Sequence, residues 1–168
     1  KFAFAASANA TDWSDLAWVS FGGGGATNGS GTYGYIQSGS PSYTTRIQKV
    51  NLTTAATATD VSNLTIGRTT AGGTSSSTYG YCAAGYGPTQ SNVIDKFNMS
   101  TEAYSTDVGD CTITIHTRTG SSSTTYGYTA GGTGNINVIE KHSFTTDGNA
   151  TDVGDLSEGF EHPSGTQY

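Results

Sequence analysis

The chain has 168 residues and a net charge of −6 at pH 7, with only seven lysine and arginine residues. A surface that binds phosphate groups needs a cationic footprint, so we expect no nucleic-acid partner. No apolar run approaches the roughly 20 residues that span a bilayer, so we expect no membrane insertion. Only 12% of the residues are charged, which argues against a disordered chain and favours an ordered fold with a thin core.

Three short phrases repeat along the chain with a nearly constant period. A Tyr-Gly-Tyr phrase begins at Tyr33, Tyr79 and Tyr126, in steps of 46 and 47 residues. A phrase that opens with Thr-Asp begins at Thr11, Thr59, Thr106 and Thr151. A third phrase, whose copies read RIQKV, VIDKF and VIEKH, begins at Arg46, Val93 and Val138. A period in the forties made of strand-like pieces is typical of β-propellers, so the sequence predicts an all-β propeller of four-stranded antiparallel blades, each about 46–47 residues long.

Taken in order, the chain is expected to hold about three and a half blades in a single repeat domain. Residues 1–16 form half a blade, with a third strand and its turn in 1–10 and a fourth strand in Thr11–Leu16. Three complete blades follow at about 17–65, 66–112 and 113–156, and residues 157–168 begin a partial blade. We therefore expect a processed product or a piece of a longer polypeptide.

The Tyr-Gly-Tyr phrase has the chemistry of a buried strand. Side chains alternate across a strand, so the two tyrosine rings share one face and the glycine leaves bare backbone on the other. We expect the first face to pack in the core and a neighbouring group to approach the second face closely. The glycines that follow, such as Gly131 and Gly132, are expected to form turns because glycine adopts positive φ readily.

Cys82 and Cys111 occupy repeat positions that hold small or apolar residues in the other copies. In a four-stranded blade these positions lie on the second and fourth strands, with the third strand between them. Neighbouring strands are about 4.8 Å apart, so the two α-carbons would be about 10 Å apart, beyond the reach of a disulfide. We predict two free thiols in the core.

The order of an aromatic strand ending in Gly-Gly, a Val-Ile-Glu-Lys strand and a fourth strand ending in Leu resembles the Kelch-type β-propeller repeat, over essentially the whole chain. Arg68 and Arg118 match the arginine that commonly opens a Kelch repeat, and Trp13 matches the fourth-strand tryptophan, which valine replaces in the later copies. The Gly/Ser/Thr-rich form of the repeat is similar to propeller repeats in large structural proteins of phages and aquatic bacteria. This resemblance implies a virion fibre or surface adhesin, and thus an extracellular or virion location.

The number of blades in a closed ring stays open between two alternatives. The half blade at 1–16 and the partial blade at 157–168 are complementary in kind, as a four-bladed ring in one chain requires. Four blades are the low end of the usual range of about 4 to 8, and stacked repeats bury their faces only against neighbours. We therefore favour a larger ring or array, whose partners are further copies of the chain or the rest of a longer parent chain.

Aspartates repeat with the same period and are the side chains best suited to a metal ion: Asp12, Asp15, Asp60, Asp107, Asp110, Asp152 and Asp155. Residues 147–152 have the alternating oxygen ligands of a calcium loop, but the other copies break this pattern and no glycine stands at its sixth position. Aspartates of this kind commonly cap backbone amides in turns or bulges. We predict capping, no metal site and no cofactor.

Six Asn-x-Ser/Thr sequences are candidate N-glycosylation sites: Asn9, Asn28, Asn51, Asn63, Asn98 and Asn149. Composition accounts for part of this set, because a chain so rich in serine and threonine would contain about two or three such sequences by chance. The alternative is that several carry sugar, if the source glycosylates secreted proteins.

No residue pattern marks a catalytic site. The three histidines stand at different phases of the repeat, and His142 is interpreted as a blade-face residue because Val50 and Phe97 hold the same position. Four glutamates are candidates for a glycosidase-type carboxylate pair, and nothing in the sequence selects two of them: Glu102, Glu140, Glu158 and Glu161. Because the repeat copies are nearly interchangeable, we predict that the protein is not an enzyme.

The residues best suited to contact a partner are loop residues that differ between copies, because variable loops on a constant scaffold carry recognition. These candidates are Tyr43, Tyr86, Gln90 and Tyr104. Tyrosine rings stack on sugar rings, so host-surface carbohydrate is the expected ligand. We predict a structural or adhesive propeller that binds such glycans or assembles with itself, with a carbohydrate-processing propeller enzyme as the alternative.

Overall fold

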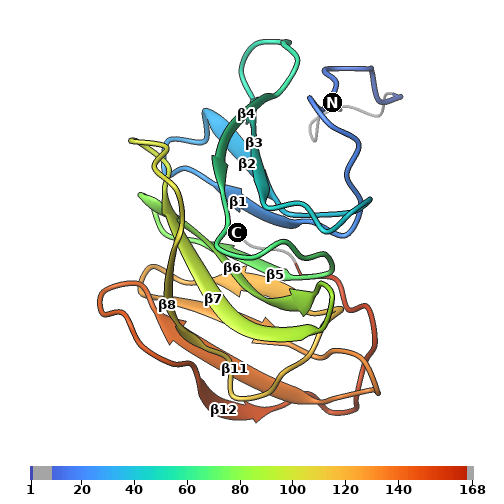
Figure 1. The fold of residues 1–168 in the computed structure, drawn as a ribbon, viewed down its shortest axis with the longest axis vertical. Coiled ribbons are helices and arrows are strands. Elements are labelled where there is room, and N and C mark those ends of the chain that lie inside the picture. Colours follow the sequence, from blue (N-terminus) through green and yellow to red (C-terminus); the bar gives the residue numbers. More distant parts are fainter. Residues whose placement is uncertain (2–8, 166–168) are drawn as a thin grey trace.

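The computed structural model describes residue 1 and residues 9–165, which form twelve β-strands and no helix (Figure 1). The strands make three antiparallel sheets of four, which we call blades 1, 2 and 3. Blade 1 contains β1 (Gly24–Thr27), β2 (Tyr33–Gln37), β3 (Arg46–Asn51) and β4 (Thr59–Asn63). Blade 2 contains β5 (Gly72–Ser75), β6 (Tyr79–Tyr86), β7 (Gln90–Asn98) and β8 (Thr106–Asp110). Blade 3 contains β9 (Thr119–Ser122), β10 (Tyr126–Ala130), β11 (Val138–Ser143) and β12 (Thr151–Asp155).

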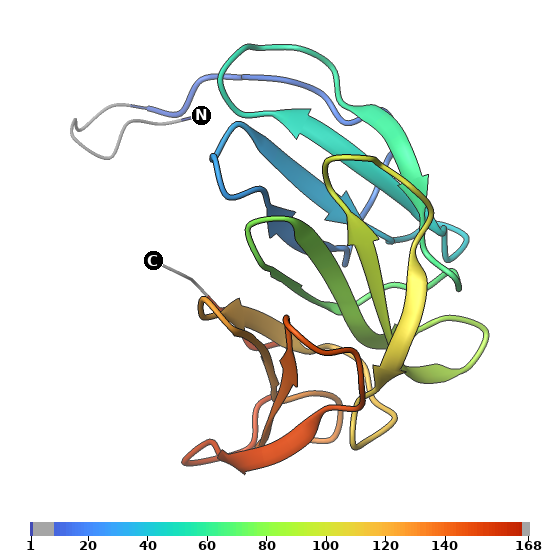
Figure 2. The same ribbon diagram turned by 90° about the vertical axis from the view of Figure 1, so that its left-hand side faces the viewer.

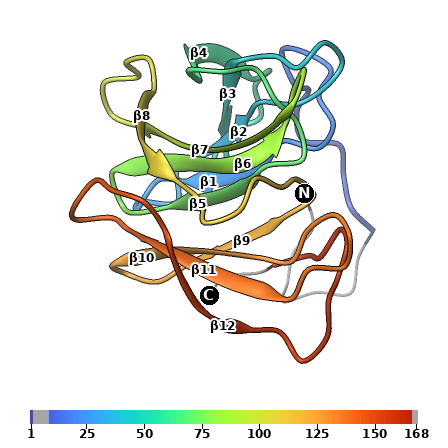
Figure 3. The same ribbon diagram turned by 60° about the horizontal axis from the view of Figure 1, so that its bottom comes forward.

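The blades are arranged around their first strands, as Figure 2 shows from one side. In Figure 3 these strands, β1, β5 and β9, lie next to one another in that order. The Thr27 amide donates to the Ser75 hydroxyl at 3.3 Å, and the Ser75 amide donates to the Ser122 hydroxyl at 3.0 Å. The prediction of an all-β fold of four-stranded, propeller-like blades is confirmed, and the described residues do not close the blades into a ring.

The glycine of each Tyr-Gly-Tyr phrase pairs with a large or β-branched residue on the third strand. Gly80 lies opposite Phe97, and Gly127 lies opposite His142. A Cβ on Gly80 would lie 2.2 Å from the Phe97 ring, and one on Gly127 would lie 2.4 Å from the His142 ring. The predicted close approach to bare backbone is therefore confirmed: the ring on the third strand covers the glycine and leaves no room for a side chain.

The same rings join one blade to the next. Tyr35 of blade 1 meets Phe97 of blade 2 edge to face, with ring centroids 5.2 Å apart. Tyr81 of blade 2 meets His142 of blade 3 at 5.1 Å. Tyr35 and Tyr81 are fully buried, so the second tyrosine of the phrase is the main aromatic contact between blades.

Both cysteines are buried free thiols, as predicted. Cys82 belongs to the apolar cluster between blades 1 and 2, and Cys111 to the cluster between blades 2 and 3. Burial raises the pKa of Cys111 to about 12, which makes its thiolate scarce at neutral pH.

A buried ion pair ties the connection before blades 2 and 3 to the third strand of each. Arg68 lies 2.7 Å from Asp95, and Arg118 lies 2.9 Å from Glu140, and all four side chains are fully buried. Each arginine also donates to a carbonyl of the second strand, at Cys82 and Thr129 respectively. Burial raises the pKa of Asp95, while the charge of Arg68 opposes this rise.

Blade 1 fills the same position without charge. Gln48 stands where Asp95 and Glu140 stand in the later blades. The Trp18 amide donates to the Gln48 side-chain oxygen at 2.9 Å, and the Gln48 amide group donates to the Trp18 carbonyl at 3.2 Å. A neutral side chain thus forms the hydrogen bonds at a buried position that an ion pair occupies in the other blades.

The strand predicted at Thr11–Leu16 is wrong, since this segment is not a strand. Its groups contact the end of β3 and the loop after it instead: the Ala58 amide donates to the Asp15 carbonyl at 2.9 Å, and the Trp13 indole donates to the Asn51 carbonyl at 3.2 Å. A strand needs a continuous ladder of backbone partners, and contacts to a loop do not provide one. The third strand predicted in 1–10 falls mostly on residues 2–8, which lie outside the described residues.

Two of the repeated aspartates cap backbone amides, as predicted. The carboxylates of Asp107 and Asp152 accept from the amides of Gly109 and Gly154, both at 3.1 Å. Asp60 instead pairs with Arg46 at 3.2 Å. Within the described part of the chain, no three histidine, cysteine or acidic side chains are grouped in a way that could hold a metal ion.

Candidate functional site

The loops of the three blades lie at two opposite ends of the strands, which we name after Tyr43 and Tyr104. The Tyr43 end contains the loops between second and third strands and the connections between blades. The Tyr104 end contains the loops between first and second strands and between third and fourth strands. Equivalent loops of the three blades share an end because their first strands run in the same direction.

Three rings from three segments meet at the Tyr43 end, and we call them the aromatic cluster. Tyr43 lies in the loop after β2, Tyr86 ends β6, and His116 lies in the connection between blades 2 and 3. The ring centroids of Tyr43 and Tyr86 are 5.7 Å apart in an edge-to-face arrangement, and those of Tyr86 and His116 are 5.1 Å apart. Tyr43 is 38% exposed and Tyr86 is 36% exposed, so both side chains contact solvent while their rings pack together.

Backbone contacts between blades hold the cluster in place. Thr69 and Tyr86 exchange backbone hydrogen bonds of 2.7 and 2.8 Å. A Cβ on Gly67 would lie 1.8 Å from the carbonyl oxygen of Tyr43, so a glycine is required where the two segments cross. The tyrosines are therefore positioned by paired and closely packed backbone.

His116 gives the cluster a neutral polar group. Burial lowers the pKa of His116, the nearby Glu161 carboxylate opposes this shift, and His162 adds to it. The imidazole is therefore uncharged at neutral pH. Flat apolar faces beside phenol hydroxyl groups and a neutral imidazole can stack on a ring and form hydrogen bonds with its hydroxyl groups.

The structure brings together three of the four predicted contact residues. Gln90 pairs with Tyr86 across β6 and β7 and is exposed, so it lies beside the aromatic cluster. Tyr104 is 74% exposed but lies in the loop between β7 and β8, at the opposite end. Tyr104 therefore does not belong to the same site.

His116 was missed by sequence reasoning, although a signal for it exists. It shares one repeat position with Phe21 and Thr69, so this position carries a different side chain in each copy. Phe21 is exposed, and its carbonyl accepts from the Thr69 hydroxyl at 3.0 Å. Variation between copies, the criterion that selected the tyrosines, would also have selected this position.

The candidate glycosylation asparagines make local hydrogen bonds. The side-chain oxygens of Asn51 and Asn98 each accept from two backbone amides of the turn that follows, at distances from 2.8 to 3.1 Å. Ser143 has the same role in blade 3, so this position is a turn cap in all three blades. The Asn28, Asn63 and Asn149 oxygens also accept hydrogen bonds, and Asn9 is exposed.

The four candidate glutamates do not share one site. Glu140 is buried against Arg118, and Glu102 pairs with Lys49 at 2.5 Å in the Tyr104 end. Glu158 and Glu161 are exposed in the segment after β12.

No protein-family model matches the chain, and no curated protein is significantly similar to it. Within residue 1 and residues 9–165 there is no helix with the length and apolarity that crossing a bilayer requires. The resemblance to Kelch repeats remains a prediction.

Proposed function

We propose that the chain is a structural and adhesive β-propeller of a virion fibre or extracellular surface filament, and that its aromatic cluster binds host-surface carbohydrate. The observation that carries this proposal is the meeting of Tyr43, Tyr86 and His116 from three segments at one end of the blades. The cluster presents partly exposed rings on a scaffold of regular strands.

The chemistry of the cluster fits a sugar ring. A pyranose has an apolar face of C–H groups that stacks on an aromatic ring, and hydroxyl groups at its edge that need hydrogen-bond partners. Tyr43 and Tyr86 supply inclined rings and phenol hydroxyl groups, and Gln90 supplies an exposed amide beside them. Because the rings are held by packed backbone, little conformational entropy is lost on binding.

The rest of the molecule suits a rigid spacer, because each blade contacts the next in the same way. Lys49 of blade 1 pairs with Glu102 of blade 2 at 2.5 Å, and Lys96 of blade 2 pairs with Asp147 of blade 3 at 2.6 Å. Each such pair contributes little energy, but together with the stacked rings they give successive blades one fixed orientation.

A glycan array followed by titration calorimetry tests the carbohydrate site. We expect the chain to retain a set of neutral glycans, and Tyr43→Ala and Tyr86→Ala each to weaken the best of them about tenfold, since one stacked ring contributes about 1.4 kcal/mol. Tyr104→Ala is the matched control, because it removes an exposed tyrosine at the opposite end.

Two results would count against this function. Retention of no glycan, or equal losses in the Tyr104→Ala and Tyr86→Ala variants, would show that the aromatic cluster is not a sugar site. Mass spectrometry of the bound glycan after prolonged incubation separates binding from catalysis. We expect unchanged glycan, and shortened products would favour the enzyme alternative.

A further inference from the structure

The segment that follows β12 lies beside His116, the third ring of the aromatic cluster. Both pack on the loop between β10 and β11. The Thr133 amide donates to the His116 carbonyl at 3.0 Å, and the Gly132 amide donates to the Phe160 carbonyl at 2.9 Å. A Cβ on Gly132 would lie 3.0 Å from the His116 carbonyl oxygen, so the two segments meet closely on this loop.

Glu161 directly follows Phe160 in this segment, and its side chain is exposed. Its carboxylate raises the pKa of His116 against the effect of burial, and this influence is a sign of proximity. Charges at a protein surface act on one another over about 10 Å before salt screens them. A group bound on the aromatic cluster therefore lies within reach of the Glu161 charge.

No cation of the chain belongs to the aromatic cluster. All seven lysine and arginine residues lie in the described part of the chain, and each has a partner elsewhere. Arg68 and Arg118 are fully buried in their ion pairs. The other five lie over aromatic rings: Lys1 over Trp13, Arg46 over Trp18, Lys49 over Tyr33, Lys96 over Tyr79 and Lys141 over Tyr126.

This distribution of charge has a consequence for the ligand. A sulfate or carboxylate group on a sugar ring finds no lysine or arginine to pair with at the aromatic cluster, and the Glu161 carboxylate repels it. An uncharged sugar stacks and forms hydrogen bonds without this penalty. Specificity of this kind arises from an unfavourable contact with the wrong ligand.

We propose that Glu161 is a specificity-determining residue of the carbohydrate site: it rejects glycans that carry a sulfate or carboxylate group near the stacked ring and leaves uncharged glycans as ligands. This inference rests on the proposed function, whose site it shares, and adds the charge class of the ligand.

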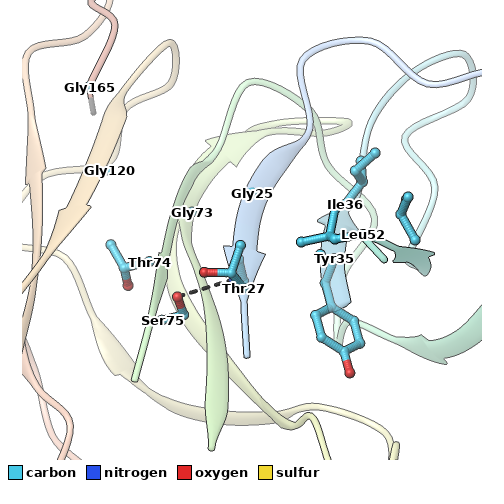
Figure 4. A pocket seen from close by; sticks show the side chains of 13 residues that line it. Gly25, Thr27, Tyr35, Ile36, Leu52, Gly73, Thr74, Ser75, Gly120 and Gly165 are labelled. Carbon is cyan, nitrogen blue, oxygen red and sulfur yellow. Dashed lines mark hydrogen bonds between the residues drawn. The ribbon is translucent and has the colours of Figure 1, made fainter. Parts of the chain in front are cut away.

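Two cavities elsewhere on the molecule offer no competing site for an anion. One, of about 680 Å³, lies against the first strands and blade 1 (Figure 4). The other, of about 750 Å³, is lined by serine, threonine, asparagine and glycine at the Tyr104 end. None of the described residues that line either cavity is charged. A gain in binding of anionic glycans after substitution of Glu161 can therefore be assigned to the aromatic cluster.

Matched pairs of glycans on an array, followed by titration calorimetry, test this role of Glu161. Each pair is a neutral glycan and the same glycan with one sulfate group. We expect the unsubstituted chain to bind the neutral member at least threefold more tightly, as a surface charge interaction allows. Glu161→Gln should reduce this ratio, and Glu161→Lys should reverse it. In about 1 M salt the three proteins should show the same ratio, because screening removes the charge effect.

Glu158→Lys is the matched control, because Glu158 is exposed in the same segment and the substitution changes the net charge equally. The carboxylate that acts on His116 is that of Glu161. The control variant should therefore discriminate between the members of each pair as the unsubstituted chain does.

Three outcomes would overturn the role of Glu161: equal affinity of the unsubstituted chain for both members, an unchanged ratio in Glu161→Lys, or the same reversal in Glu158→Lys. If neutral glycans still bind and Tyr86→Ala still weakens them, the carbohydrate site itself stands and only its charge selection fails. Retention of no glycan by any of these proteins would overturn both.

Discussion

One position on the third strand shows how a single side chain is adapted to the space between blades. His142 stands where Phe97 stands in the preceding blade, and it packs against Tyr81 and Phe144. Its Nε2 lies 3.2 Å from the Thr74 hydroxyl, so the imidazole keeps one polar partner in a buried site. Burial lowers the pKa of His142 to about 4, with the Glu140 carboxylate opposing the shift.

This shift predicts a loss of stability in acid. The folded-state pKa lies below the ordinary value of 6.5, so the unfolded chain binds the proton more readily. The stability associated with neutral His142 is therefore complete above about pH 6.5 and is lost as the pH falls towards 4, by about 3 kcal/mol in total. Urea denaturation of the wild type at a series of pH values measures this loss.

His142→Phe is the matched variant, because Phe97 shows that the fold accepts phenylalanine at this position. The difference in unfolding free energy between variant and wild type should grow in favour of the variant between pH 6.5 and 4. Parallel pH profiles for the two proteins would mean that His142 does not titrate in this range.

At the scale of the strand, the buried polar site of each blade anchors the third strand to the segment that precedes the first. Arg68 and Asp95 fill it with an ion pair, whereas Gln48 and the backbone of Trp18 fill it in blade 1. The neutral arrangement shows that the fold needs satisfied hydrogen bonds at this point and does not need charge. Removing one partner of the pair, however, leaves the other charged and buried.

We therefore expect strong coupling between Arg68→Met and Asp95→Leu. Each single variant should lose about 3–5 kcal/mol of unfolding free energy, and the double variant should lose clearly less than the sum. Chemical denaturation of the four proteins completes the cycle. Arg46→Met is the control, since its pair with Asp60 is about one-third exposed and should contribute about 1 kcal/mol or less. Additive losses at Arg68 and Asp95 would contradict the pairing.

At the scale of the molecule, the three blades differ in how much of each is covered. Blade 2 is flanked by neighbours on both faces and contributes many of the fully buried side chains, including Tyr81, Ile94 and Phe97. In blade 3 every residue of β12 is exposed, and Tyr128 is only partly buried where Tyr35 and Tyr81 are fully buried. We therefore expect the free energy of local opening to be higher in blade 2 than in β12.

Hydrogen exchange monitored by mass spectrometry checks that order. Amides of β6 and β7 should exchange at least tenfold more slowly than those of β12, because opening blade 2 disrupts two interfaces. β10 and β11 serve as the internal comparison within blade 3. Uniform exchange across the three blades would show that the molecule opens as one unit.

The sequence by itself determined what repeats locally. Strand alternation and the period of about 47 residues predict the blades, the burial of Tyr35 and Tyr81, the close approach to the glycines and the free thiols, because these depend on local strand geometry. The expectation that both tyrosines of each phrase pack in the core is met only in part, since the first tyrosine of each phrase and Tyr128 are only partly buried. The Thr11–Leu16 strand was wrong for the same reason: the phrase is local, but a strand also needs partners.

Only the tertiary structure decided which distant residues meet. Arg68 and Arg118 are 50 residues apart, out of step with the blades, yet both reach the same carboxylate position on the third strand. Tyr43, Tyr86 and His116 come from different phases of the repeat, and they converge where the loop after β2 crosses the connection between blades 1 and 2 at Gly67. A periodic sequence specifies the face of each strand and the contacts that recur between blades. Contacts made by loops also depend on the path of each loop, and the loops between second and third strands differ in length from blade to blade.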